Sequence, residues 1–338
     1  MRLSLPGLGP AAAAFGKGGR LVLALAAVTT IALAGCVSMP SEEGKFERVL
    51  TVTGPVSLEL AAGSEDLKLT TGSSSQVRIS AEFSVKAWSS AEADKRVHEL
   101  SENPPIEQHG NVIRVGRRSS SGGGGDFKYE IEVPPETELR GTSGSGDVEA
   151  RGIRGPVNVT AGSGDVALSD INEQIQVLTA SGDISLSNIA GAVHLTSGSG
   201  DMALEKVHGD IRARTGSGDL AISDPGGAVT VDTSGGDVTF AHASDDLRIH
   251  TSSGNITVDG NPGSSNFWEL HTNSGDVVLR LSANPSFRLE ARSSSGDIEA
   301  SVPLTLDGSA SKHEMRARLG DGKARVEIQT SSGSITLQ

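Results

Sequence analysis

Seven short segments between residues 142 and 260 have nearly the same sequence: TSGSGDV (142–148), TAGSGDV (160–166), TASGDI (179–184), TSGSGDM (196–202), TGSGDL (215–220), TSGGDV (233–238) and TSSGNI (251–256). The aspartates recur with a constant 18-residue period at Asp147, Asp165, Asp183, Asp201, Asp219 and Asp237, and Asn255 takes the next position. Self-similarity at a fixed period indicates a unit that stacks on copies of itself. The repeat therefore outranks local propensity in assigning the fold class.

Each repeat holds two short runs in which apolar and polar residues alternate. The first run starts directly after the aspartate, as with Val166 and Leu168, and the second starts ten residues after it, as with Ile175 and Val177. Alternation with period two is typical of a half-buried strand. Two or three strands within one such period leave no room for a crossover helix, so each strand must lie beside its equivalent one coil earlier.

The pattern predicts an all-β fold: a parallel β-solenoid, or β-helix, with 18-residue coils and one short helical excursion. The usual hand of parallel β-connections favours a right-handed coil, although left-handed β-helices also use 18-residue coils. A sandwich or propeller is the main alternative. It would need hairpin turns between antiparallel strands, and it explains the in-phase apolar columns less well.

The repeated corner has a structural interpretation. Small hydroxyl side chains such as Thr179 can hydrogen-bond to the backbone at a tight bend, glycine relieves the restriction on φ, and aspartate can accept N–H bonds from the turn. The expected turn glycines are Gly146, Gly164, Gly182, Gly200, Gly218 and Gly236. The alternative is a Ca²⁺ ladder on the six aspartates, because hard cations favour oxygen ligands. We expect structural corners and no metal or other cofactor.

Residues 1–35 are predicted to be a lipoprotein signal peptide. Arg2, Lys17 and Arg20 form a basic leader, and residues 21–34 form an apolar run too short to span a membrane comfortably. Leu33-Ala34-Gly35-Cys36 resembles a bacterial lipobox, which implies a covalent lipid on Cys36. An ordinary cleaved signal is the alternative. Val37 follows the cysteine, and by the same resemblance this points to the outer membrane if the bacterium is diderm.

The remainder is expected to form a lipidated N-terminus and tether (36–46) and a single solenoid domain (47–338). The domain divides into irregular coils (47–140), regular coils (141–260) and looser coils (261–338). A short helix that starts at a serine cap is expected within residues 89–102, and Pro104-Pro105 stops it. Asp276 and Asp297 each follow after a longer interval than the regular period, which indicates three-residue corner insertions near Asn261-Pro262-Gly263 and Ala283-Asn284-Pro285. Residues 301–324 are either an excursion from one coil or part of two irregular coils.

Composition restricts the partners. The formal net charge is −13 and only ten of the 338 residues are aromatic. An acidic surface argues against nucleic acid and against adhesion to anionic headgroups. The chain has one cysteine, so an intramolecular disulfide is impossible.

The alternative of a polysaccharide-modifying β-helix enzyme requires carboxylates in a cleft built by long loops. The candidate segments are 86–128 and 301–324. Five histidines share no coil position in the sequence and are interpreted as surface residues: His194, His208, His242, His250 and His271. Four arginines are expected on an exposed face, where they could pair with acidic neighbours: Arg151, Arg154, Arg212 and Arg214.

The Ser-Gly-Asp-aliphatic repeats behind a lipobox resemble the bacterial "putative-adhesin", β-strand-repeat family, a domain of unknown function. The resemblance covers residues 47–338 and implies an envelope-exposed β-solenoid without family catalytic residues. We therefore expect a non-enzymatic envelope lipoprotein, adhesin-like in presenting a scaffold or binding surface. Its expected contacts are the membrane, through the lipid, and an envelope protein or glycan.

Overall fold

The structure of the protein is a computed structural model that describes residues 39–116, 125–307 and 310–338. Residues Met39–Gln338 form one compact unit. A continuous buried core runs from Phe46 to Leu337 within this unit, so we expect the segment to fold on its own. In the described ranges, no helix has the length and apolar character needed to cross a membrane.

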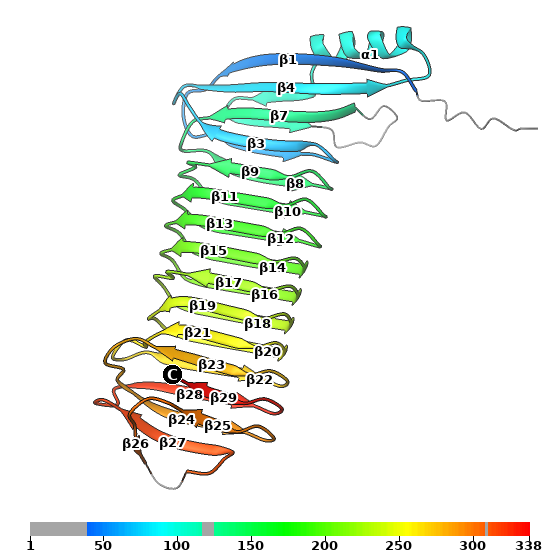
Figure 1. The fold of residues 1–338 in the computed structure, drawn as a ribbon. Helices are drawn as coiled ribbons and strands as arrows, with labels where there is room; N and C mark the ends of the chain where they lie inside the picture. Colours follow the sequence, from blue (N-terminus) through cyan, green and yellow to red (C-terminus); the bar gives the residue numbers. More distant parts are fainter. Residues whose placement is uncertain (1–38, 117–124, 308–309) are drawn as a thin grey trace, which may run out of the picture. The chain divides into compact units, whose positions relative to one another are not determined.

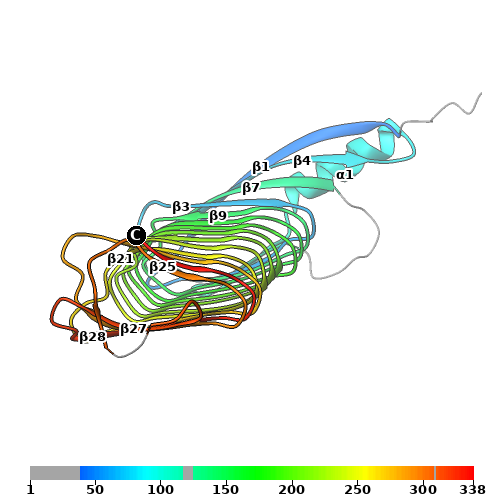
Figure 2. The ribbon, with the colours of Figure 1, turned by 60° about the horizontal axis from the view of Figure 1, so that its bottom comes forward.

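Two sheets face each other and are joined by short corners (Figures 1 and 2). Sheet A has 14 strands, in spatial order β1 (Ser41–Thr51), β4 (Gln76–Lys86), β7 (Gly125–Val133), β3 (Asp66–Thr71), β9 (Val148–Arg151), β11 (Val166–Ile171), β13 (Ile184–Ile189), β15 (Met202–Val207), β17 (Leu220–Ser223), β19 (Val238–Ala243), β21 (Ile256–Gly260), β23 (Val277–Leu281), β29 (Ile335–Leu337) and β25 (Ile298–Ala300).

Sheet B has 15 strands in the part of the chain that the structure describes. Their spatial order is β5 (Ile106–His109), β6 (Val112–Gly116), β2 (Ser57–Ala61), β8 (Glu138–Ser143), β10 (Val157–Ala161), β12 (Ile175–Thr179), β14 (Val193–Ser199), β16 (Ile211–Ser217), β18 (Val229–Gly235), β20 (Leu247–Ser253), β22 (Phe267–Thr272), β28 (Ala324–Thr330), β24 (Phe287–Ser293), β27 (Glu314–Leu319) and β26 (Thr305–Leu306). Each regular coil thus gives one strand to each sheet.

The 18-residue register predicted from the sequence is confirmed. Val157 pairs with Ile175, and Ile175 pairs with Val193, all in parallel strands. The same register joins Val166 to Ile184 in sheet A. Inward residues of both sheets are buried because the two sheets enclose a core between their facing surfaces. The fold is therefore the expected parallel β-solenoid.

The N-terminal end departs from the regular coils. Helix α1 (Ser90–Glu102) begins after the expected cap, where the Ser89 side chain accepts the Glu92 backbone N–H at 3.3 Å. Strand β1 begins at Ser41, inside the segment 36–46 that we expected to be a tether. It pairs antiparallel with β4, which in turn pairs antiparallel with β7. These antiparallel strands form one end of sheet A, and α1 contacts β1 and β4.

At both ends of the solenoid, the coils are stacked in an order that differs from their order in the sequence. The coil of β2 and β3 lies between the coil of β6 and β7 and that of β8 and β9. At the other end, β28 and β29 are inserted between β22–β23 and β24–β25. Residues 301–307 and 310–323 therefore belong to an excursion. Its strand β27 pairs antiparallel with β24 before the chain returns to form one intercalated coil.

The expected insertion at residues 261–263 lengthens a corner without changing the strands that follow it. Trp268, just after this corner, faces inward and is fully buried. Its ring Nε1–H donates to the Asp245 carbonyl at 2.7 Å, so the one polar atom of the indole is satisfied inside the coil.

Candidate functional site

The aspartate column ties neighbouring coils together. Oδ1 of Asp165 accepts the backbone N–H of Asp183 at 2.9 Å, and each equivalent pair has the same contact. The column continues past the regular repeat at both ends, from Asp66 to Asp147 and from Asp276 to Ser334. We expected the aspartates to accept N–H bonds from their own turns. The structure corrects this, because the acceptor serves the next coil.

The turn glycines are required by the spacing of the coils. A Cβ built on Gly182 would lie 1.9 Å from the carbonyl oxygen of Gly164, and Gly164 stands in the same relation to Gly146 at 2.0 Å. Of the six predicted turn glycines, only Gly218 and Gly236 have positive φ. The expectation that glycine relieves φ was therefore wrong for four of the six. Their role is to let one backbone approach the next.

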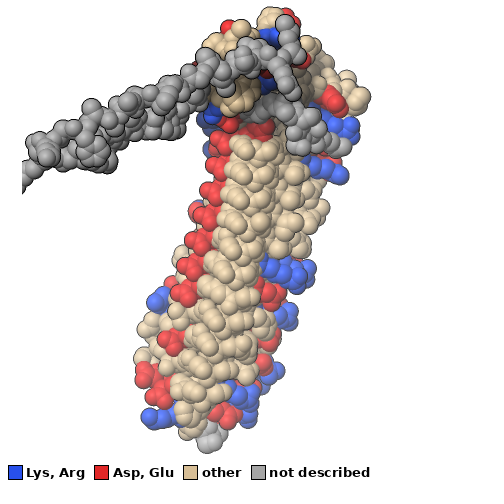
Figure 3. All heavy atoms as spheres, turned by 90° about the vertical axis from the view of Figure 1, so that its right-hand side faces the viewer, with Lys and Arg blue, Asp and Glu red and all other residues tan. Residues whose placement is uncertain are grey.

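Some of the buried corner hydroxyls hydrogen-bond to the backbone as interpreted, whereas the equivalent Ser197 Oγ and Thr251 Oγ1 are buried without a hydrogen-bond partner among the described residues. Thr179 Oγ1 accepts the Gly182 N–H at 3.1 Å, and the Thr233 hydroxyl donates to the Gly235 carbonyl at 2.7 Å. Figure 3 shows acidic side chains along one edge of the corner face, beside a broad uncharged strip. Both features follow from the repeat and from the requirements of stacking. The aspartates and glycines predicted from the sequence are thus brought together as a structural element.

A different arrangement occurs on the outer face of sheet B at its C-terminal end. Arg288 on β24 pairs directly with Arg318 on the antiparallel strand β27, and with Arg325 on the parallel strand β28. The stems of Arg288 and Arg318 both lie beside Gly322, where an added Cβ would contact each of them. We call Arg288, Arg318 and Arg325 the arginine cluster. Three guanidinium side chains therefore occupy neighbouring strands on one exposed face.

The members of the cluster differ in their partners. Arg325 forms ion pairs with Glu327 and, at 3.7 Å, with Glu290, and its Cζ lies 5.9 Å from the centroid of the Phe267 ring. Arg288 and Arg318 form no ion pair or hydrogen bond with any residue that the structure describes. Like charges directly opposite each other destabilise a strand pair. The pair is therefore left without a compensating carboxylate in the described part of the chain.

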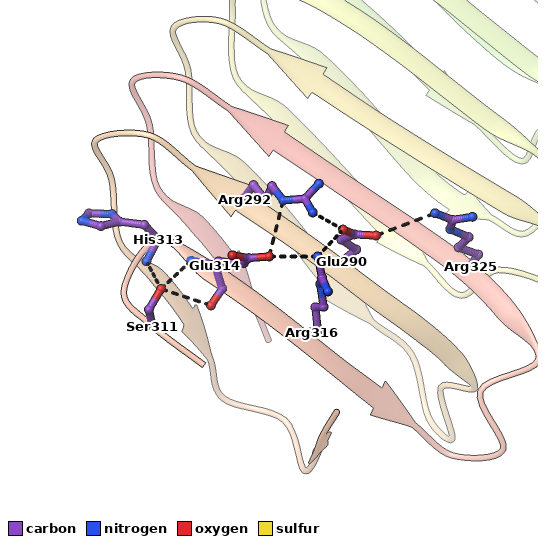
Figure 4. A network of polar contacts seen from close by, with 7 residues as sticks. All are labelled: Glu290, Arg292, Ser311, His313, Glu314, Arg316 and Arg325. Carbon is purple, nitrogen blue, oxygen red and sulfur yellow. Dashed lines mark hydrogen bonds and ion pairs between the residues drawn. The ribbon is translucent and has the colours of Figure 1, made fainter. Parts of the chain in front are cut away.

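Beside the cluster lies a compensated network, shown in Figure 4. Glu290 is ion-paired to Arg292 and, at 3.3 Å, to Arg316, in addition to Arg325. Glu314 lies 3.2 Å from Arg316 and 3.6 Å from Arg292. This network fixes the excursion strand β27 against β24. Arg288 and Arg318 lie outside this network, so their positive charges are not balanced by a described carboxylate.

A shallow hollow adjoins this network. It is lined by side chains of β22, β24 and β28: Glu269, Leu270, His271, Glu290, Arg292, Glu327, Ile328 and Gln329. Three glutamates meet there, but Arg248 lies 3.5 Å from Glu269, and the other two are paired to arginines as described above. No pair of these glutamates stands free to act as acid and base across a bond. Among the described residues, no three His, Cys, Asp or Glu side chains form a metal-binding group.

His250 and His271 correct one expectation from the sequence. They pair in register across β20 and β22, and their rings lie 5.8 Å apart. The insertion at 261–263 lengthens the interval between them beyond one regular period, which hid the shared coil position. Three of the four arginines expected on an exposed face pair with acidic neighbours. Arg151 pairs with Asp170 at 2.9 Å, Arg154 with Glu136 at 3.3 Å and Arg214 with Asp232 at 3.3 Å.

Among the residues that the structure describes, three groups have clearly shifted pKa values, each in the direction that keeps the group charged. The hydrogen bond from Arg114 to Glu59 raises the pKa of Arg114, and that from Lys206 to Glu205 raises the pKa of Lys206. The hydrogen bond from Asn188 lowers the pKa of Asp170, helped by Arg151. A catalytic acid or base needs the opposite kind of shift, toward the neutral form. None of these three groups is prepared for proton transfer.

The other sequence candidates are readily placed. Within the segment 86–128, Glu92 pairs with Arg96 and Asp126 with Lys86, so these carboxylates are compensated. In the segment 301–324, Glu314 belongs to the network and Asp321 pairs with Lys323. Cys36 lies outside the described residues. The arginine cluster was missed because its register depends on the intercalated coil, although alternating arginines in RLEAR (288–292) and RAR (316–318) were a signal.

Comparison with known proteins gives a family. The family model described as Toastrack DUF4097 matches residues 56–267 and 227–338. A solved structure described as a putative cell adhesion protein from Clostridium sporogenes ATCC 15579 is 10% identical, with a TM-score of 0.17, and the match covers 88% of this chain and 99% of that one.

A second solved structure, described as a putative adhesin from Bacteroides fragilis NCTC 9343, is 12% identical, with a TM-score of 0.23, and the match covers 87% of this chain and 97% of that one. No curated protein matches the chain. The family model spans both the regular coils and the altered C-terminal end. This chain therefore belongs to the Toastrack DUF4097 family.

Proposed function

We propose that this protein is a non-catalytic, adhesin-like scaffold of the bacterial cell envelope that holds an acidic polymer at the arginine cluster. The single observation that supports the proposal is the register of Arg288 opposite Arg318, with no carboxylate partner for either among the described residues. Guanidinium groups match phosphate and carboxylate oxygens through paired N–H donors. A bound polyanion would supply the missing negative charge.

A bound anion would relieve the repulsion between the two arginines. Two like charges about 5 Å apart repel by roughly 1 kcal/mol in water, and the repulsion grows where protein lowers the dielectric. Elsewhere on the same face, the chain places carboxylates beside its arginines, as with Arg214 and Asp232. On a protein of net charge −13, an uncompensated basic pair stands out as a local exception.

The position of the cluster suits a scaffold. Ten strand-to-strand steps separate β2 from β24 in sheet B, or about 48 Å at about 4.8 Å per step. As part of the proposal, a lipid on Cys36, in the outer membrane if the bacterium is diderm, would tether the β1 end, because Cys36 lies three residues before Met39. The cluster would then be presented at the opposite end of the solenoid.

The test is binding of inorganic polyphosphate, with polygalacturonate as a carboxylate polymer and neutral dextran as the blank. We expect the double variant Arg288→Ser/Arg318→Ser to lose at least tenfold in affinity for the acidic polymer. The matched control is Arg151→Ser/Arg214→Ser, which removes the same charge from arginines already paired with aspartates. Equal losses in the two variants would show that only net charge matters and would reject the cluster as a site.

A further inference from the structure

Trp88 is the most exposed large hydrophobic side chain among the described residues. It is 80% exposed, compared with 48% or less for the others: Met39, Val49, Leu178 and Leu306. The second tryptophan, Trp268, is fully buried. An indole left almost wholly in water forgoes a large apolar stabilisation, so its position in the fold is informative.

The backbone fixes Trp88 beside the start of the described chain. Strand β4 ends at Lys86, which pairs with Ser41, the first residue of β1. The Ala87 N–H donates to the Pro40 carbonyl at 3.1 Å, and Ser89 caps helix α1. Trp88 is therefore held between two anchored neighbours, next to the point where the chain continues back toward residue 36.

That location indicates what covers the indole. Cys36, the predicted lipidation site, is three residues from Met39 and can be no farther than about 11 Å along an extended chain. Met39 is itself 44% exposed. Tryptophan is enriched at membrane interfaces because its ring is apolar and its N–H can remain hydrated. A lipid surface is thus the one environment expected to lie within reach.

We propose that Trp88, together with Met39, is an interfacial contact that inserts into the lipid headgroup region and holds the β1 end of the solenoid against the membrane. The inference rests on the proposed lipid anchor for its location. Glu42 and Glu43 in the adjoining β1 form no ion pair with a described residue, whereas Glu92 is paired with Arg96 and Lys86 with Asp126, so the preferred surface is zwitterionic and not anionic. Insertion restricts rotation of the solenoid about its tether, which one acyl anchor point cannot do.

The experiment uses residues 39–338, the compact unit, attached through an N-terminal histidine tag to phosphatidylcholine vesicles that contain a nickel-chelating lipid. The tether replaces the natural lipid and keeps the protein at the surface whatever the strength of the contact. Dibrominated phosphatidylcholine then quenches any tryptophan that enters the bilayer. Trp268 reports in the same sample that the solenoid is folded, because its emission stays shielded from both lipid and solvent.

We expect brominated lipid to quench the Trp88 emission at least twofold, and the quenching to disappear in Trp88→Phe, which retains Trp268. Without the tether, Trp88→Ser should lower the vesicle partition coefficient by about tenfold, as expected for losing one large buried apolar side chain. The control Leu178→Ser removes an exposed apolar side chain, 47% exposed, from β12 in the middle of the stack. It should change neither result.

Two outcomes overturn the inference. The first is a folded, tethered protein whose Trp88 is not quenched. The second is a concentration-dependent blue shift of Trp88 without vesicles, which would assign the surface to a second copy of the chain. Measuring polyphosphate binding by the Trp88→Ser variant distinguishes a failure of this inference from a failure of the proposed function. That binding should persist, because Trp88 lies beside β1 and β4 at one end of the solenoid and the arginine cluster lies on β24, β27 and β28 at the opposite end.

Discussion

Asp237 and Asn255 make the same contact with side chains of different charge. Oδ1 of Asp237 accepts the Asn255 N–H at 2.8 Å, and Oδ1 of Asn255 accepts the Asp276 N–H at 2.9 Å. The amide of Asn255 also donates to Oδ2 of Asp237 at 3.4 Å. The corner therefore requires an acceptor oxygen at this position, and it does not require a negative charge.

The first prediction follows from that equivalence. Asp201→Asn should change the free energy of unfolding by less than about 0.5 kcal/mol, because the acceptor for the Asp219 N–H is kept and repulsion between neighbouring carboxylates is relieved. Asp201→Ala should cost about 1 kcal/mol through loss of that acceptor. Urea unfolding of the two variants measures the difference. A larger loss in Asp201→Asn than in Asp201→Ala would contradict the role given to the oxygen.

The second prediction concerns calcium. The Oδ1 atom of each aspartate in the column already accepts a backbone N–H. We therefore expect the same unfolding midpoint in EDTA and in about 1 mM Ca²⁺, a concentration that fills extracellular calcium sites. Differential scanning calorimetry of the wild type gives the comparison. Stabilisation that saturates with calcium and is lost in Asp165→Asn/Asp183→Asn would assign the column to a cation ladder instead.

The third prediction tests whether a turn glycine is needed because the backbones of neighbouring coils approach closely or because its φ is unusual. Gly182→Ala places a methyl group 1.9 Å from the Gly164 carbonyl oxygen and should cost about 3 kcal/mol or more, since a buried backbone must move. Gly235→Ala is the matched control in an equivalent corner, where the nearest atom would be 3.9 Å away. It should lie within about 1 kcal/mol of the wild type. Equal unfolding midpoints for the two variants would refute the spacing argument.

The sequence predicted the regular coils because their period repeats without interruption. Val157, Ile175 and Val193 were expected to stack, and they do. The helix was predictable for a local reason, since Ser89 is a good cap and proline follows the segment. The intercalation of β28 and β29 could not be predicted, because pairing between residues far apart in the chain leaves no period in the sequence.

The candidate site was less predictable than the fold. The contacts of the aspartates and glycines depend on the neighbouring coil and not on their own turn. Arg288 and Arg318 belong to separate strands that are distant in the chain, and nothing in their local sequence states that they face each other. That relationship arises only when β27 folds back antiparallel onto β24.

The fourth prediction is a pH dependence at Asp170. Hydrogen bonding from Asn188, supported by Arg151, lowers the pKa of Asp170 below its ordinary value of 3.8. The ionised form is therefore favoured in the folded state, and its contribution is present above about pH 4 and lost as the pH falls through the lowered pKa. The stability difference between the wild type and Asp170→Asn should shrink below about pH 4, as measured by urea unfolding at several pH values. A stability difference that grows as the pH falls would contradict the direction of the pKa shift given for Asp170.

The arginine cluster is tested most directly by the salt dependence of polyphosphate binding. Each guanidinium that replaces a counterion on the polymer adds about 0.7–0.9 to the slope of log affinity against log salt. We predict that Arg288→Ser/Arg318→Ser lowers the magnitude of this slope by about 1.5, while Arg151→Ser/Arg214→Ser leaves it unchanged. An unchanged slope in the Arg288/Arg318 variant would mean that these two side chains do not contact the polymer, and the proposed function would have to be abandoned.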